Sequence, residues 1–174
     1  SKKACRVIRK KIRNKICINF SKRLSGLFFV HKNLNYLKNF FVFVNKNEIK
    51  ILLSSALENL SVIRTLIRTY LTLHKVEERN IMEILTITDE LATNVVEHGY
   101  QYQPGELIIT IEKEGSIIKL VVEDNGVGFD ESKMSKEEGG MGLRIARSMS
   151  DSFKIEKKVN GTKFKVEKKI KEVC

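Results

Sequence analysis

The 174 residues suffice for one folded domain with its own core and are too few for two domains of ordinary size. Hydrophobic residues make up 42% of the chain and charged residues 30%, which is typical of a globular protein and argues against global disorder. The cysteines Cys5, Cys17 and Cys174 are far apart, and the histidines lack ligand-like spacing, so neither a disulfide framework nor a structural zinc site is expected. This cysteine usage favours a reducing, cytoplasmic compartment.

The formal net charge of +11 is concentrated at the start of the chain. Residues 1–46 contain 13 Lys or Arg and no acidic residue, which leaves 19 basic against 21 acidic side chains in the rest. A domain that binds nucleic acid usually spreads its basic groups over a folded surface. The near-neutral remainder therefore argues against direct binding to nucleic acid.

Residues 1–46 form a basic leader without a clear hydrophobic period. Three interpretations are open: a disordered basic tail, a spurious upstream extension of the reading frame, or an arm that contacts a partner or a membrane surface. The longest apolar run, residues 40–44, is far shorter than the roughly 20 residues that span a bilayer, so we expect no membrane span. We place the folded domain at residues 47–170 and treat residues 171–174 as a tail.

Regular hydrophobic periods begin after the leader. Residues 48–53 alternate weakly and predict a strand, whereas residues 57–74 have helical spacing. A second helix carries an apolar stripe from Ile81 to Val95 and is expected to end near Gly99.

Two hairpins are predicted in the second half of the chain. Residues 106–112 and 117–123 form the first, and residues 153–158 and 162–168 form the second, around an Asn-Gly turn. A glycine-rich loop and a helix at residues 143–150 separate them. This order predicts an α+β fold, a two-layer sandwich in which helices cover one face of a mixed, mainly antiparallel sheet.

The first chemical motif is the pair Glu90 and Asn94 on the second helix. The spacing of four places both on one face, opposite the apolar stripe. A carboxylate beside an amide oxygen suits a general base next to a magnesium ligand, because Mg²⁺ prefers oxygen donors. Taken alone, the same spacing is also typical of a solvated helix face.

The second motif is Asp124, Gly126 and Gly128, which directly follow a strand. A carboxylate at a strand end can accept a hydrogen bond from the exocyclic amine of adenine, and the glycines let the backbone pass close to a flat base. Taken alone, the segment is also typical of a glycine-containing turn.

The third motif is a glycine cluster at the start of a helix. Its residues are Gly139, Gly140, Met141, Gly142 and Leu143. Free backbone N–H groups at the positive end of a helix form a phosphate site. No Lys-Ser or Lys-Thr follows, so the cluster is not a Walker A loop.

In this order, and with Gly161 and Thr162 in a late strand, the motifs resemble those of the GHKL (Bergerat-fold, histidine kinase-like) ATPases. The resemblance covers residues 48–169. The segment from Glu90 to Tyr100 is most similar to that of the anti-sigma-factor serine kinases.

The resemblance implies a role for each residue at the nucleotide. Asn94 would coordinate Mg²⁺, Asp124 would bind the adenine amine of ATP, and Thr162 would support Asp124. Gly126 and Gly128 would form the floor of the pocket.

The resemblance also implies the roles at the phosphates. Glu90 would be the catalytic base, residues 139–143 would donate backbone hydrogen bonds, and residues 130–138 would form a lid over the triphosphate. Lys133, Lys136 and Arg144 are further candidate phosphate contacts, although a solvated lid is the other interpretation of the two lysines.

The function implied is that of a protein-serine/threonine kinase that is also an anti-sigma factor. It would bind a sigma factor, phosphorylate a serine of an anti-anti-sigma (STAS-type) protein, and form a homodimer, with residues 58–68 taking part in partner binding. Two alternatives stay open: an ATP-gated binding module without phosphotransfer, and the catalytic domain of a split histidine kinase. The latter needs a histidine-bearing helical hairpin that the leader does not supply, and His98 is interpreted as a helix-end residue.

Overall fold

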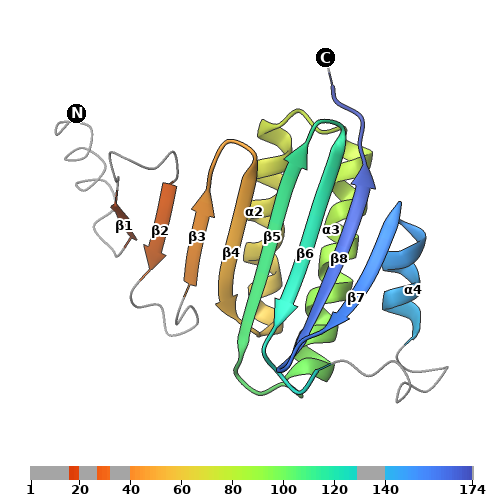
Figure 1. Cartoon of the computed structure of the whole chain (residues 1–174). Coiled ribbons are helices and arrows are strands. Elements are labelled where there is room, and N and C mark those ends of the chain that lie inside the picture. Colours follow the sequence, from red (N-terminus) through yellow and green to blue (C-terminus); the bar gives the residue numbers. More distant parts are fainter. Residues whose placement is uncertain (1–15, 20–26, 32–39, 129–139, 174) are drawn as a thin grey trace.

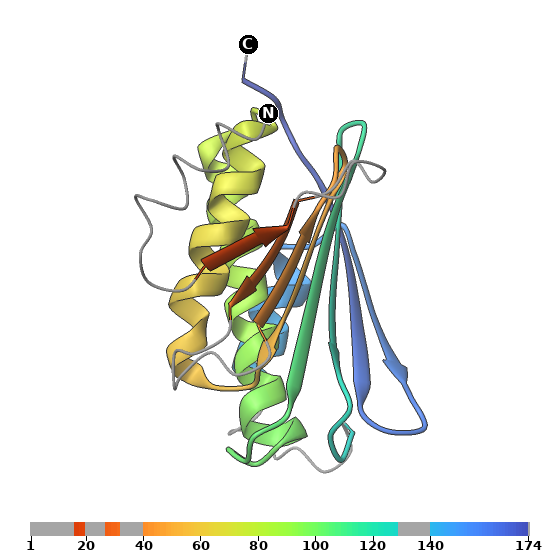
Figure 2. The same ribbon diagram turned by 90° about the vertical axis from the view of Figure 1, so that its left-hand side faces the viewer.

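The computed structural model describes residues 16–19, 27–31, 40–128 and 140–173. Within these ranges the strands form one eight-stranded sheet in the order β1-β2-β3-β4-β5-β6-β8-β7 (Figure 1). The side view shows the helices α2 and α3 on the same side of the sheet (Figure 2). The predicted two-layer α+β sandwich is confirmed.

The strands are β1 (Ile16–Asn19), β2 (Leu27–His31), β3 (Phe40–Val44), β4 (Glu48–Ser54), β5 (Glu106–Glu114), β6 (Ile117–Asp124), β7 (Ser152–Lys157) and β8 (Thr162–Lys169). The helices are the 3₁₀ turn η1 (Leu57–Asn59), α2 (Leu60–Leu73), α3 (Glu78–Asn94), the π-helical turn η2 (Val95–Gly99) and α4 (Gly140–Ser148).

Every strand pair among the described residues is antiparallel, so a mixed sheet is not found in this part of the chain. The reason lies in the connection that contains α4. This connection leads from β6 to β7 at the edge of the sheet and leaves one strand position open between them. The chain then turns back through the hairpin, and β8 fills that position between β6 and β7 (Figure 1). Strands β6 and β7 run in the same direction but are not neighbours.

The hydrophobic core lies between the helices and the covered face of the sheet. Buried residues alternate along β5 and β6, as expected for strands with one covered face. The fully buried side chains include Ile51, Leu53, Ile63, Ile67, Leu71, Ile84, Leu91, Leu107, Ile109 and Phe164. This packing holds the ends of α3 and β6 at the same end of the molecule (Figure 1).

The sheet extends upstream of the expected domain boundary at residue 47. Strand β3 pairs with β4 from Phe41 opposite Leu52 to Val44 opposite Ile49, and Val42 is only 2% exposed. The prediction that the leader is disordered or spurious through residue 46 is therefore wrong for residues 40–44, which form β3. The run was too short and too uniformly apolar for alternation to show, although its aromatic and β-branched composition favoured a strand.

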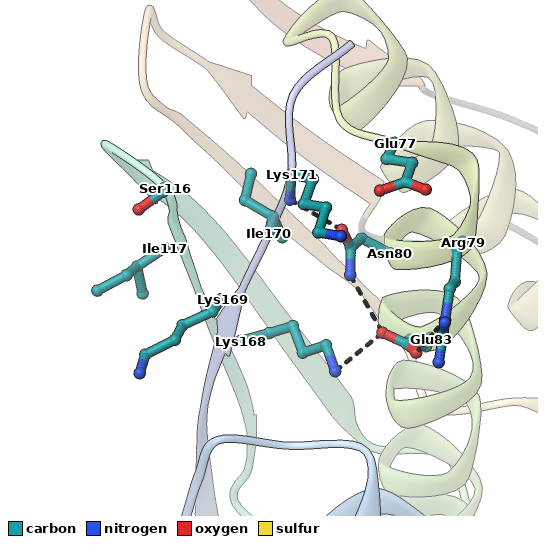
Figure 3. A pocket seen from close by; sticks show the side chains of 10 residues that line it. All are labelled: Glu77, Arg79, Asn80, Glu83, Ser116, Ile117, Lys168, Lys169, Ile170 and Lys171. Atoms are coloured by element: carbon teal, nitrogen blue, oxygen red, sulfur yellow. Dashed lines mark hydrogen bonds and ion pairs between the residues drawn. The ribbon is translucent and has the colours of Figure 1, made fainter.

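The end of the chain is also part of the fold. The backbone of Lys171 accepts a hydrogen bond from the Glu77 N–H and donates one to the Asn80 side chain, each at 2.9 Å. Beside it, Asn80 and Lys168 both bond to the Glu83 carboxylate (Figure 3). The expected tail is thus wrong for residues 171–173, which join the connection between α2 and α3 to the sheet. Residue 174 lies outside the described part.

None of the helices in the described ranges combines the length and the apolar composition that crossing a bilayer requires.

The packing of β3 predicts the effect of shortening Val42. In the full chain, Val42→Ala should lower the free energy of unfolding in urea by about 2 kcal/mol, because it removes buried methyl groups and leaves a cavity. Lys50→Ala on neighbouring β4 is the control, since Lys50 is exposed and its loss should cost less than about 0.5 kcal/mol. Equal stabilities for Val42→Ala and the wild type would contradict the placement of β3 in the core.

Candidate functional site

Asp124 lies at the end of β6 with 1% of its surface exposed. One carboxylate oxygen accepts a hydrogen bond from the Gly126 N–H at 2.8 Å, and the other accepts one from the Thr162 N–H at 3.1 Å. Burial raises the pKa of Asp124, and these backbone donors partly oppose that rise. The structure thus fixes a buried carboxylate in one orientation at the position where the sequence predicts an adenine contact.

Glycines from separate segments pack around this carboxylate. A Cβ on Gly99 would lie 3.4 Å from the Asp124 Cγ, and a Cβ on Gly126 would overlap the Gly99 carbonyl. Gly161, with φ of +87°, approaches the Asp124 carbonyl so closely that any side chain there would collide with it. Gly128, with φ of +84°, lies next to Gly161. Gly126 and Gly161 need glycine because backbone meets backbone there, and Gly128 needs it because of its positive φ.

Glu90 and Asn94 lie on the last turns of α3. The Asn94 side-chain nitrogen donates a hydrogen bond to the Glu90 carbonyl at 2.7 Å, which leaves the amide oxygen as the donor atom for a cation. Asn94 is only 8% exposed, so a solvated helix face is the wrong interpretation for this residue. The reason is that α4 packs against α3 and covers a second side of that helix.

The glycine cluster lies directly beside this pair. Helix α4 begins at Gly140, earlier than the expected start at residue 143, so residues 140–142 form its first turn. Gly142 is so close to Glu90 that a Cβ would collide with the carboxylate, and it would lie 3.7 Å from the Asn94 side-chain nitrogen. Backbone N–H groups in a first helical turn have no partner within the helix. The turn therefore offers donors next to Glu90 and Asn94.

The side chains within the cluster differ in their surroundings. The Met141 side chain is 72% exposed. Its backbone lies in the first turn of α4, between Gly140 and Gly142. Leu143 is buried in the core and anchors the helix. Gly139 and the expected lid at residues 130–138, with Lys133 and Lys136, lie outside the described residues.

The motifs therefore form one continuous site. Gly142 lies against Glu90 and near Asn94, and η2 leads from Asn94 to Gly99, which lies beside Asp124. Thr162 is fully buried and reaches Asp124 from β8. Segments that are far apart in the sequence meet where α3 and β6 end (Figure 1).

Two side chains that the motifs did not single out hold the end of β6. Lys158 donates from its ammonium group to the Asp124 carbonyl at 3.0 Å and to the Asn125 side-chain oxygen at 2.9 Å. The Tyr100 hydroxyl accepts a hydrogen bond from the Asn125 N–H at 2.8 Å. The sequence carried no signal for Lys158, since one lysine among many on a hairpin has no distinguishing spacing.

The described residues contain no group of three or more His, Cys, Asp or Glu side chains that could hold a metal ion. A cation at Asn94 would consequently depend on oxygens from phosphate and water for most of its coordination, which is the usual behaviour of Mg²⁺. The available amide oxygen of Asn94 fits this chemistry.

Comparison with known proteins gives consistent results. Residues 53–168 match the family described as the histidine kinase-like ATPase domain. The Anti-sigma F factor of Geobacillus thermodenitrificans is 31% identical over 137 residues, covering 72% of this chain and 94% of that protein. The Anti-sigma F factor of Shouchella clausii is 29% identical over 120 residues, covering 63% of this chain and 82% of that protein.

Among solved structures, the RsbU and RsbW domains of Rv1364c from Mycobacterium tuberculosis align with a TM-score of 0.58 and 19% identity. The alignment covers 73% of this chain and 33% of that chain. This likeness shows a shared fold.

The burial of Asp124 predicts a pH dependence of stability. Because its pKa is raised above the ordinary value of 3.8, the unfolded chain loses this proton first as the pH rises. The contribution of Asp124 to the free energy of unfolding is therefore largest below pH 3.8, and it falls as the pH rises through the folded-state pKa. In urea unfolding at a series of pH values, the wild type should lose stability relative to Asp124→Asn across this window. A difference that stays constant or grows in favour of the wild type would contradict this account.

Proposed function

The chain belongs to the histidine kinase-like ATPase family, and on that premise we propose that it binds ATP with Mg²⁺ and phosphorylates a serine of a protein partner. The observation that carries this proposal is the convergence of Asp124, Asn94, Glu90 and the first turn of α4 in one site. A buried acceptor lies at one end of this site, and backbone donors beside a carboxylate lie at the other.

Asp124 is proposed to select adenine. Its carboxylate accepts hydrogen bonds but cannot donate them when ionised, so it pairs with an exocyclic amine and disfavours a carbonyl at the same position. The backbone N–H of Thr162 holds the carboxylate in place, and Gly126 and Gly128 bring the backbone close to the base. A guanine base presents its carbonyl where adenine has the amine.

Asn94 and the first turn of α4 are proposed to hold the phosphates. The Asn94 amide oxygen would be the protein ligand of Mg²⁺, which supplies positive charge to the triphosphate when bound. Backbone N–H groups of Gly140, Met141 and Gly142 would donate to phosphate oxygens, as the N-terminus of a helix favours.

Glu90 is proposed as the general base. Its carboxylate lies against Gly142, at the phosphate end of the site. In the transfer, Glu90 takes the proton of the serine hydroxyl, the serine oxygen forms a bond to the γ-phosphorus, and the bond to the β-phosphate oxygen breaks to release ADP. Phosphate is thereby moved to the partner and the proton is left on Glu90.

A sigma factor and an anti-anti-sigma protein are the proposed partners, and a homodimer is the proposed assembly. The names of the two anti-sigma F factors described above support the first, and the resemblance of the motifs supports the others. On the outer surface of α2 and α3 lies a groove of about 430 Å³ that includes Arg64 and Arg68. Arg64 pairs at 3.0 Å with Asp89, which also lines this groove and directly precedes Glu90 in the sequence.

Substitution of Glu90 tests the transfer step. A pulldown from native extract with ATP and Mg²⁺ supplies the partner, and phosphosite mapping identifies the acceptor serine. Glu90→Gln should lower the rate of phosphorylation by at least about 100-fold, because it removes the base. Its affinity for ATP should stay within about threefold of the wild type, since the carboxylate is assigned no role in binding the nucleotide.

Glu97→Gln is the matched control for this test. Glu97 lies on η2, accepts a hydrogen bond from Tyr102 at 2.8 Å, and is assigned no role in transfer. Its phosphorylation rate should equal that of the wild type. Transfer that survives in Glu90→Gln would contradict the assigned base. A partner that is captured with ATP but never phosphorylated by the wild type would instead indicate an ATP-gated binding module.

A further inference from the structure

The ladder between β5 and β6 ends at an unusual contact. Its last pair is Leu107 opposite Asp124, and a regular ladder would continue with Glu106 opposite Asn125. The hydroxyl of Tyr100 takes the place of that pair. It accepts hydrogen bonds from the Asn125 N–H at 2.8 Å and the Glu106 N–H at 3.1 Å, and it donates to the Glu106 carbonyl at 2.8 Å. Its one proton and both lone pairs are therefore used.

The ring of Tyr100 is closely packed by its neighbours. Gly105 lies so close that a Cβ there would overlap the ring of Tyr100, and the ring packs against the hydrophobic core. The Gly105 carbonyl is itself held by the Ser55 N–H at 2.9 Å. Burial raises the pKa of Tyr100, so the hydroxyl keeps the proton that it donates to Glu106.

The backbone N–H groups of the three residues that follow Asp124 each have their own acceptor. Asn125 donates to the Tyr100 hydroxyl, Gly126 to the Asp124 carboxylate, and Val127 to the Gly99 carbonyl at 3.0 Å. Two of these acceptors are consecutive residues at the end of η2. The loop is thus held from one side by the segment that follows Asn94.

We propose that Tyr100 is a positioning residue for the nucleotide site. By ending the ladder at Asp124, its hydroxyl turns the chain so that the Gly126 N–H reaches the Asp124 carboxylate and fixes the orientation in which that carboxylate meets adenine. This inference rests on the proposed function, because the carboxylate is assigned there to the adenine amine. Tyr100 itself is assigned no contact with the nucleotide.

Two substitutions in the same turn, each of which removes one hydroxyl oxygen, test the proposal. Tyr100→Phe removes the hydroxyl that Asn125 and Glu106 use. Tyr102→Phe is the control, because Tyr102 is 63% exposed and its hydroxyl bonds only to Glu97 among the hydrogen bonds described. Calorimetry of the full-length variants with ATP and with GTP, both with Mg²⁺, gives the two affinities. Tyr100→Phe should weaken ATP binding by about tenfold and reduce the preference for ATP over GTP, because an unpaired backbone N–H lets the loop shift. Tyr102→Phe should stay within about twofold of the wild type.

The preference for ATP separates positioning from a general loss of stability. Partial unfolding would lower both affinities by the same factor and leave their ratio unchanged. Gly105→Ala is a second probe, since its Cβ displaces the tyrosine ring without touching the hydroxyl chemistry. It should reduce the same ratio, and the double variant with Tyr100→Phe should be no worse than the more affected single variant, because both act through one contact.

The outcomes distinguish this inference from the proposed function. The positioning role alone would be overturned by either of two results. One is a ratio of ATP to GTP affinity in Tyr100→Phe that equals the wild-type ratio, and the other is a loss of ATP affinity in Tyr102→Phe as large as that in Tyr100→Phe. If the wild type itself showed no preference for ATP, the proposed function and the positioning role would both be overturned.

Discussion

The burial of one carboxylate at the end of β6 is the constraint on which the site depends. Asp124 is removed from water, which disfavours its charged form, and the fold partly compensates with the nearby ammonium group of Lys158 and, at the carboxylate itself, with backbone donors. Such donors must be brought in by main chain, so the neighbouring segments have to approach closely. Gly126 and Gly161 meet this requirement, because a Cβ at either position would collide with backbone.

The same close packing connects Asp124, the proposed adenine acceptor, to the residues that are proposed to hold the phosphates. The chain that contacts Asp124 at Gly99 is the continuation of the helix that carries Glu90 and Asn94, and α4 begins against that pair at Gly142. The distance between the proposed adenine end and the proposed phosphate end is therefore set by rigid elements packed on the core. Preorganisation of this kind is what positioning and electrostatic catalysis of phosphoryl transfer require.

The sequence predicted the helices and strands well because each has a local cause. Helical periods, hairpin turns and glycine clusters are visible within a few residues, and the spacing of four between Glu90 and Asn94 places them one turn apart on α3. Contacts that depend on the tertiary fold were missed. The burial of Asn94 results from α4, the Tyr100 hydroxyl acts on residues that only the fold brings near, and β3 joins the core through pairing with β4.

The central claim is that Asp124 recognises the exocyclic amine of adenine, and the most direct measurement compares two nucleotides that differ at that group. Calorimetry of the full chain with Mg²⁺ and either ATP or inosine triphosphate, in which a carbonyl replaces the amine and N1 gains a hydrogen, tests recognition of this edge of the base. The account predicts that inosine triphosphate binds at least about tenfold more weakly, because a buried carboxylate then faces a carbonyl. Equal affinities for the two nucleotides would contradict it.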